Sequence, residues 1–209
     1  RLLYTVPTYN NPTGVSLDAG RRQALVGLAA TEHVTILEDD VYRELVYEGD
    51  PPASLWSLAE PGTVIRLGSF SKSLSPGLRV GYMTADATIA NASVEGGLLE
   101  SGGGISHIAS LVVAEYARTG AYATNVTHLR AVYGARRDAL IGALNTEMGD
   151  LADWTVPAGG YFVWVTLRSP VDLAALRAAA ERHGTSFVPG TVFFADGVGG
   201  RSSLRLAFS

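Results

Sequence analysis

A loop lysine between two predicted strands is the first residue of this sequence that could do chemistry. Lys72 lies in a segment rich in serine, glycine and proline that runs from Gly68 to Arg79. A lysine at a strand end, crowded by hydroxyl groups, is placed where its amine can act as a nucleophile toward a carbonyl carbon. The alternative is a solvated loop lysine, which is the usual state of this residue type.

The neighbours of Lys72 suit a phosphate group. Ser69 and Ser71 offer two hydroxyl donors, and Arg79 offers a guanidinium fork that matches the geometry of a phosphate dianion. A serine-rich loop can also be only a connection between strands. We therefore interpret Ser69, Ser71 and Arg79 as candidate phosphate ligands beside a candidate nucleophile.

Acidic residues end the strand that precedes this loop. Asp39 lies between Glu38 and Asp40 after an apolar run, and Tyr42 follows three residues after Asp39. Ligands of open α/β sheets bind at such strand ends. An aspartate there can hold a pyridinium nitrogen protonated, and a tyrosine hydroxyl can donate to a phenolate-like oxygen. The alternative is an exposed acidic strand end.

Two further candidates lie near opposite ends of the chain. Asn11 begins an Asn-Pro-Thr-Gly turn, in which proline and glycine favour a chain reversal that can present the amide of Asn11 to a ligand oxygen. Arg205 lies in the strand-like run Leu204–Phe208. Its guanidinium could bind a carboxylate through two parallel hydrogen bonds, or it could form a surface ion pair.

These side chains need elements that bring strand ends together. Apolar runs alternate with helical patterns, which predicts an α/β fold with a mostly parallel sheet and crossover helices. We expect a helix from a cap at Ser16 to about His33, with Leu25 and Leu28 on its buried face. The strands expected before residue 100 are Leu2–Val6, Val34–Leu37, Thr63–Leu67 and Arg79–Thr84.

From Ala87 onward, helical patterns predominate and the strands are fewer. A looser helical stretch from Ala87 to Ala117 is broken at residues 102–104, three glycines where we expect a flexible or closely approached backbone. Apolar residues then recur every three to four positions from Tyr122 to Met148, which predicts one long helix. The remaining segments predict a small α+β layer, with strands at 161–167, 186–188 and 204–208 and a helix at 172–183.

Composition narrows the classes of function. The 209 residues are 47% hydrophobic and 17% charged, which excludes intrinsic disorder, and a net charge of −4 argues against nucleic acid or an anionic membrane as partner. The absence of cysteine excludes disulfides and thiolate metal sites and fits a reducing cytosol. The four histidines are scattered, so no metal site is predicted. No uncharged stretch reaches the length of a membrane span.

The order of these motifs resembles that of one enzyme family. The Asn-Pro-Thr-Gly turn, Asp39 with Tyr42, the serine and lysine loop and the final arginine strand together resemble pyridoxal-phosphate-dependent aminotransferases of fold type I, class I/II. Residues 38–42 and 69–82 are most similar to the subgroup of 2-aminoadipate and kynurenine aminotransferases and to the aminotransferase-like half of MocR-type regulators. The resemblance extends from Pro7 to Phe208.

The resemblance implies a role for each candidate residue. Lys72 would be the Schiff-base lysine, Asp39 the partner of the pyridine nitrogen, and Tyr42 a donor to the ring O3′ oxygen; these three are the candidate catalytic residues. The remaining roles are contact with O3′ and the substrate for Asn11, phosphate binding for Ser69, Ser71 and Arg79, and a clamp on the substrate α-carboxylate for Arg205.

The resemblance also implies an activity. We expect a cytoplasmic transaminase that is a homodimer in its full-length form and moves an amino group between an amino acid and a 2-oxo acid. Two alternatives stay open. The same scaffold can carry out elimination or decarboxylation, because the cofactor supplies the electron sink. The chain could also be the effector domain of a MocR-type transcription regulator, which binds the cofactor without turnover.

Members of the family have about half of their large domain before the Asn-Pro-Thr-Gly turn. We therefore expect this chain to be a fragment, with residues 1–121 part of the cofactor-binding large domain, residues 122–148 a bridging helix and residues 149–209 a truncated C-terminal small domain. We expect the fragment alone to be inactive.

Overall fold

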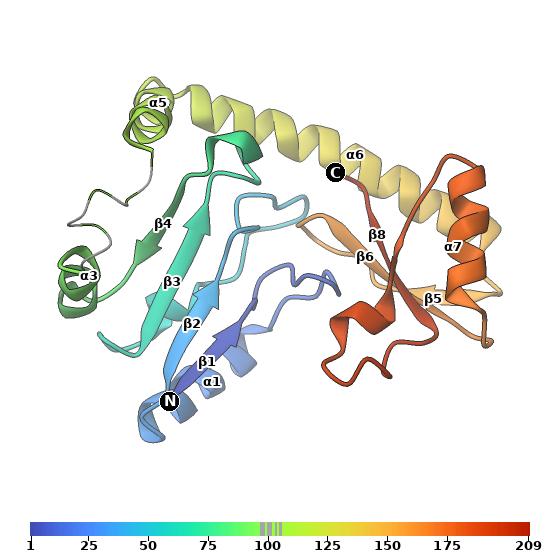
Figure 1. Ribbon diagram of the computed structural model, residues 1–209, viewed down its shortest axis with the longest axis horizontal. Coiled ribbons are helices and arrows are strands. Elements are labelled where there is room, and N and C mark those ends of the chain that lie inside the picture. The colour runs from blue at the N-terminus through green and yellow to red at the C-terminus, as the bar shows by residue number, and fades with distance from the viewer. Residues whose placement is uncertain (97–98, 100–101, 103, 105) are drawn as a thin grey trace. The chain divides into compact units, whose positions relative to one another are not determined.

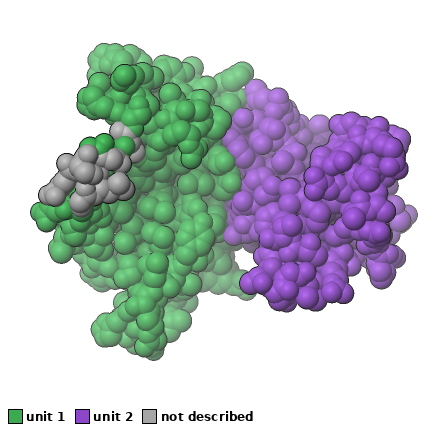
Figure 2. Space-filling view, viewed as in Figure 1, with its two compact units in different colours: residues 1–8, 16–46, 50–130 green, residues 9–15, 47–49, 131–209 purple. Residues whose placement is uncertain are grey.

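The computed structural model describes residues 1–96, 99, 102, 104 and 106–209, and it contains two compact units (Figure 2). Unit 1 consists of residues 1–8, 16–46 and 50–130. Unit 2 consists of residues 9–15, 47–49 and 131–209. The domain limits expected from the sequence remain a prediction.

Unit 1 is built on a four-stranded sheet with the order β1-β2-β3-β4 (Figure 1). The first three strands are parallel, and β4 is antiparallel to β3. This arrangement confirms the predicted α/β class with a mostly parallel sheet. The strands are β1 (Leu2–Thr5), β2 (Thr35–Asp39), β3 (Val64–Ser69) and β4 (Gly81–Thr84).

Helix α1 (Ala19–Thr31) packs against one face of this sheet. Its N-cap is Asp18, whose carboxylate accepts from the backbone N–H of Arg21, so the prediction of a cap at Ser16 is wrong. The predicted buried face is also wrong in part, because Leu28 is 59% exposed. The residues that α1 buries are Arg22, Val26 and Ala29, whose spacing of four and three residues lies along one side of a helix.

The register of β2 decides which way its acidic residues point. Ile36 and Glu38 are buried on the side of α1, and alternation directs Leu37 and Asp39 to the opposite face. The carboxylate of Glu38 accepts from the backbone N–H groups of Leu55 and Trp56, at 2.8 and 3.0 Å. Those groups belong to the first turn of α2 (Leu55–Leu58), so Glu38 has a structural role.

Longer helices follow the strands of the first sheet. They are α3 (Ala87–Val94), α5 (His107–Arg118) and α6 (Ala121–Glu147). Helix α6 confirms the long helix predicted from the sequence, and its ends differ from the predicted ends by one residue each. Of the three glycines at the predicted break, Gly102 has a positive φ of 79°, and Gly103 lies outside the described residues. Within the described part of the chain, no helix combines the length and the apolar character needed to cross a bilayer.

Unit 2 contains a second sheet, which is antiparallel and has the order β5-β6-β8-β7. Val163 and Val165 of β6 are fully buried in its core, together with Leu204 of β8. The three-residue strand β5 was not expected from the sequence. The elements are β5 (Ala152–Trp154), β6 (Phe162–Leu167), α7 (Leu173–Arg182), β7 (Val188–Pro189) and β8 (Ser203–Ala207).

Candidate functional site

Six of the eight candidate residues lie in unit 1, at the ends of β2 and β3 and in the segments that follow these strands. The strands are parallel, and Asp39 at the end of β2 pairs in register with Leu67 of β3. Parallel pairing therefore brings the acidic strand end and the Ser69–Arg79 loop to the same edge of the sheet.

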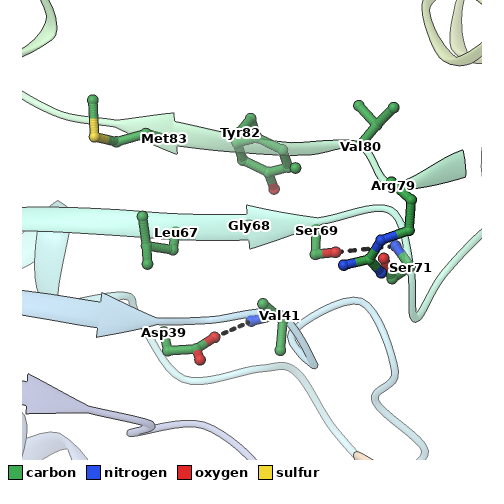
Figure 3. Close-up of a pocket in the computed structure, with 11 residues that line it drawn as sticks. Asp39, Val41, Leu67, Gly68, Ser69, Ser71, Arg79, Val80, Tyr82 and Met83 are labelled. Carbon is green, nitrogen blue, oxygen red and sulfur yellow. Dashed lines mark hydrogen bonds between the residues drawn. The ribbon is translucent and has the colours of Figure 1, made fainter. Parts of the chain in front are cut away.

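A cavity of about 490 Å³ opens at this edge (Figure 3). It brings Asp39 together with Ser69, Ser71 and Arg79, four of the residues selected from the sequence. The other lining residues come from the loop after β2 and from β3, β4 and the approach to β4: Val41, Leu67, Gly68, Val80, Gly81, Tyr82 and Met83.

Local hydrogen bonds shape the end of the cavity that carries Ser69, Ser71 and Arg79. The backbone N–H of Ser71 donates to Oγ of Ser69 at 3.1 Å, and a hydroxyl that accepts in this way can still donate its own proton. Arg79 follows the short 3-10 helix η1 (Pro76–Leu78) in a left-handed conformation with φ 54°, and its side chain is exposed. The cavity thus holds hydroxyl donors and a guanidinium, which is the donor set that a phosphate dianion needs.

Gly68 is required by the packing beside this set. A Cβ atom on Gly68 would overlap the ring of Tyr82, which lies across it. Tyr82 also packs against Phe70, with 5.5 Å between ring centres. The glycine in β3 is therefore explained by the close approach of an aromatic ring to the backbone.

Asp39 has a hydrogen-bond partner that the sequence analysis missed. The hydroxyl of Tyr4 on β1 donates to Oδ2 of Asp39 at 2.5 Å, and the backbone N–H of Val41 lies 3.4 Å from Oδ1. Burial, followed by the hydrogen bond and the charge of Asp39, raises the pKa of Tyr4 to about 12. The sequence shows that side chains alternate between the two faces along β1 and β2. This alternation identifies Tyr4 as the partner of Asp39 only when the register Tyr4↔Leu37 is known.

The neighbouring acid, Asp40, has a different environment. Its side chain is fully buried, and Oδ2 pairs with Arg66 at 2.8 Å and with Arg43 at 3.3 Å. Asp39, by contrast, lines the cavity. Of the two adjacent aspartates, Asp39 is thus the one placed to meet a ligand.

Lys72 lies in the turn that follows β3, with Nζ 5.9 Å from the centre of the Tyr42 ring. Tyr42 is buried. The next residue, Ser73, is tied to α6: its hydroxyl shares a hydrogen bond of 2.7 Å with the hydroxyl of Tyr122, and its carbonyl accepts from the amide of Asn125 at 2.9 Å. The lysine therefore lies on a turn anchored by the residue that follows it.

Lys72 is also the only lysine in the 209 residues, and the other fifteen basic residues are arginines. A chain that uses arginine at every other basic position keeps a primary amine at one place only. Because arginine stays charged in proteins and cannot serve as an amine nucleophile, this composition favours a chemical role for Lys72 over the solvated loop residue.

The two remaining candidates, Asn11 and Arg205, lie together in unit 2. Nη1 of Arg205 on β8 donates to Oδ1 of Asn11 at 2.7 Å. The guanidinium carbon lies 4.1 Å from the ring centre of Phe162 and 5.0 Å from that of Phe193, so two aromatic rings contact the cation. Neither phenylalanine could be identified from the sequence, because nothing in their spacing points to Arg205.

The turn that carries Asn11 is held from several sides within unit 2. The side-chain oxygen of Asn10 accepts from the hydroxyl of Thr13 at 3.0 Å, and Thr155 donates to the carbonyl of Thr13 at 2.8 Å. Gly14 has φ 71°, and a Cβ atom there would lie 2.6 Å from the carbonyl oxygen of Phe162. Glycine at this position permits both the left-handed backbone and the close approach of β6.

The comparisons with known proteins agree with these observations. The family model of aminotransferase class I and II matches residues 5–209. The aromatic-amino-acid aminotransferase 1 of Thermococcus litoralis is 37% identical over 202 residues, which cover 93% of this chain and 46% of that protein. The uncharacterized HTH-type transcriptional regulator YisV of Bacillus subtilis is 33% identical over 211 residues, which cover 100% of this chain and 42% of that protein.

A solved structure shows the same fold. LysN, the α-aminoadipate aminotransferase of Thermus thermophilus, was crystallised with N-(5′-phosphopyridoxyl)-L-leucine and matches with a TM-score of 0.88 and 34% identity. The match covers 99% of this chain and 53% of LysN. The chain spans about half the length of the relatives it matches. The match to the family model over residues 5–209 confirms the resemblance found in the sequence, and the chain belongs to the aminotransferase class I and II family.

Proposed function

We propose that the full-length protein is a pyridoxal-phosphate-dependent transaminase that moves an amino group between an amino acid and a 2-oxo acid. The cavity of unit 1 carries this proposal, because it combines a carboxylate with two hydroxyls and a guanidinium. These groups complement the ring nitrogen and the phosphate of pyridoxal phosphate. Membership of the family and the likeness to LysN support the same cofactor.

When bound, pyridoxal phosphate supplies a ring that withdraws electrons from the substrate. In our proposal, Ser69 and Ser71 donate to the phosphate, and Arg79 adds charge-assisted hydrogen bonds. Asp39 accepts from the ring nitrogen and keeps the proton on it, because a carboxylate stabilises an adjacent cation. Tyr42 donates to the O3′ oxygen of the ring.

Lys72 has two tasks in this proposal. Its amine would hold the cofactor by condensing with its aldehyde, with loss of one water. Once an amino acid had displaced this amine, the amine would be free to take the proton from Cα of the substrate and to deliver it to C4′. The anchoring of Ser73 by Tyr122 and Asn125 limits the movement of the turn that carries this amine.

Arg205 is the proposed ligand of the substrate α-carboxylate. Its guanidinium donates to Asn11 and lies over the rings of Phe162 and Phe193, which limits the orientations that it can adopt. A planar guanidinium matches a carboxylate through two parallel hydrogen bonds, which a lysine cannot provide. The family resemblance implies that Asn11 also contacts the O3′ oxygen of the cofactor.

A regulator is the second candidate function, because YisV matches the whole of this chain at 33% identity. An effector domain would use the same residues to bind the cofactor and an amino acid, and it would release no oxo acid.

As an enzyme, the protein would take small amino and 2-oxo acids as its substrates. We further propose a homodimer located in the cytoplasm.

One experiment tests the lysine and separates the two functions. Borohydride reduction of the full-length protein loaded with pyridoxal phosphate should label Lys72, as read by peptide mapping. A label on another lysine, or no label, contradicts the assignment. A set of amino acids added to the unreduced protein should then yield stoichiometric 2-oxo acid, whereas cofactor and amino-acid binding without any oxo acid would favour the regulator.

The variant Lys72→Ala should retain binding of the cofactor and the amino acid and lose the proton transfer. Acid–base help from a positioned side chain is typically worth about 10²–10⁴-fold in rate. Stopped-flow measurement of oxo-acid formation checks this loss. An added primary amine in solution should restore part of the rate, since it can replace the missing base, and an unchanged rate in Lys72→Ala would remove the lysine from the mechanism.

A further inference from the structure

We propose that Tyr4 is a positioning residue for Asp39: its hydroxyl binds Oδ2 of the carboxylate and leaves Oδ1 for the ring nitrogen of the cofactor. The inference rests on the proposed function, since it gives Asp39 the role described above. The hydrogen bond from Tyr4 is 2.5 Å long, whereas the nearest backbone donor to Oδ1, the N–H of Val41, lies at 3.4 Å. Oδ2 is thus strongly engaged, and Oδ1 is engaged only weakly.

The sheet register explains why a tyrosine can do this. Tyr4 pairs with Leu37 in the parallel β1–β2 ladder, and Asp39 is the next residue of β2 on the same face. A diagonal neighbour on the adjacent strand lies beyond the reach of a short side chain but within that of a long aromatic one. A serine at position 4 would be too short, and a phenylalanine would span the distance without a donor.

Tyr4 is in the form that donates. A tyrosine hydroxyl is protonated at neutral pH even at its ordinary pKa of about 10, and burial followed by the hydrogen bond and the charge of Asp39 raises the pKa of Tyr4 further, to about 12. Tyr42 is the other titratable group that raises the pKa of Tyr4, and the amine of Lys72 lies near the Tyr42 ring. The hydroxyl therefore donates to Oδ2 of Asp39, and in this proposal Oδ1 accepts from the ring nitrogen.

The test is Tyr4→Phe in the full-length protein loaded with pyridoxal phosphate. Loss of the donor lets the carboxylate of Asp39 turn away from the ring nitrogen, so the ring nitrogen carries less positive charge and the lysine-bound cofactor holds its own proton more tightly. The pH midpoint of the visible absorption of the bound cofactor should then rise by about 0.5–1 unit, which corresponds to one ordinary hydrogen bond. Cofactor affinity should fall by roughly 3–10-fold.

Two comparisons separate this role from a general loss of structure. Tyr116→Phe, on the distant helix α5, should leave the midpoint unchanged. In the Asp39→Asn background, Tyr4→Phe should cause no additional shift, because the carboxylate through which it acts is absent. An unchanged midpoint in Tyr4→Phe, or an equal shift in both backgrounds, overturns the inference alone. Absence of a lysine-bound cofactor in the unmutated protein overturns the proposed function together with it.

Discussion

At the scale of single residues, two adjacent aspartates have opposite surroundings. Asp39 lines the cavity and accepts from Tyr4, whereas Asp40 is buried between Arg43 and Arg66. Carboxylates one position apart on an extended backbone point to different sides. One is available to a ligand, and the other neutralises two partly buried cations. Their mutations should therefore separate function from stability.

We expect Asp39→Asn to lower the rate of oxo-acid formation by roughly 10²–10³-fold, the loss typical for one pre-organised electrostatic contact, with little change in thermal stability. Asp40→Asn should instead destabilise the fold by about 3–5 kcal/mol, because it leaves two arginines without their buried carboxylate. Steady-state kinetics and urea unfolding measure the two effects. The reverse pattern would mean that the acid of the site is Asp40.

At the scale of elements, a buried arginine joins three segments of unit 1. Arg22 on α1 has no exposed surface, and its guanidinium donates to the hydroxyl of Thr8 and to three carbonyl groups. The carbonyl acceptors, at 2.6–3.0 Å, belong to Pro7 after β1, Leu17 before α1 and Ala53 before α2. The planar fork of arginine matches acceptors that lie in several directions.

Arg22→Lys should destabilise the protein by about 2–4 kcal/mol, because a single ammonium group cannot reach all four acceptors and leaves buried carbonyls unsatisfied. The adjacent Arg21 provides a matched control, since its side chain is 77% exposed. Arg21→Lys should change the unfolding free energy by less than about 0.5 kcal/mol. Equal unfolding midpoints for the two variants would show that the hydrogen bonds of Arg22 make no net contribution to the free energy of unfolding.

At the scale of the whole molecule, the sheet face that carries Asp39 also presents apolar side chains to solvent. Leu2, Tyr4 and Met83 lie on this face by register, and they are 64%, 56% and 40% exposed. The predicted strand that begins at Leu2 is thus β1, an edge strand of this sheet whose apolar side chains are largely exposed. Apolar surface of this kind marks a contact site or an aggregation hazard.

We expect residues 1–209 expressed alone to bind pyridoxal phosphate roughly 10²-fold more weakly than the full-length protein. The solved relative LysN is about twice as long as this chain, and the loss of several charge-assisted hydrogen bonds to the cofactor would lower its affinity by this amount or more. Titration of both proteins with the cofactor, followed by absorbance, measures the ratio. Tight stoichiometric binding and transamination by residues 1–209 alone would contradict this expectation.

Much of the architecture follows from local patterns that can be read along the chain. Alternating apolar runs predicted the parallel strands, and periodic apolar residues predicted α6 almost to its ends, because both patterns reflect the repeat of a single element. The four motifs, in order, also identified the family. Each motif is short and carries its own chemistry, so it can be recognised without knowledge of what packs against it.

The contacts between distant residues were decided by the tertiary structure. Tyr4 and Asp39 are 35 positions apart and meet through strand register, and Asn11 and Arg205 are 194 positions apart. The N-cap of α1 is Asp18 and not Ser16, and residue type alone does not separate the two, because serine and aspartate are both favoured at this position. Local propensity cannot predict such pairs, because a shift of one residue in register would turn each side chain to the opposite face of its sheet. The sequence by itself therefore determined the family and its motifs, and the fold determined the partners of each functional side chain.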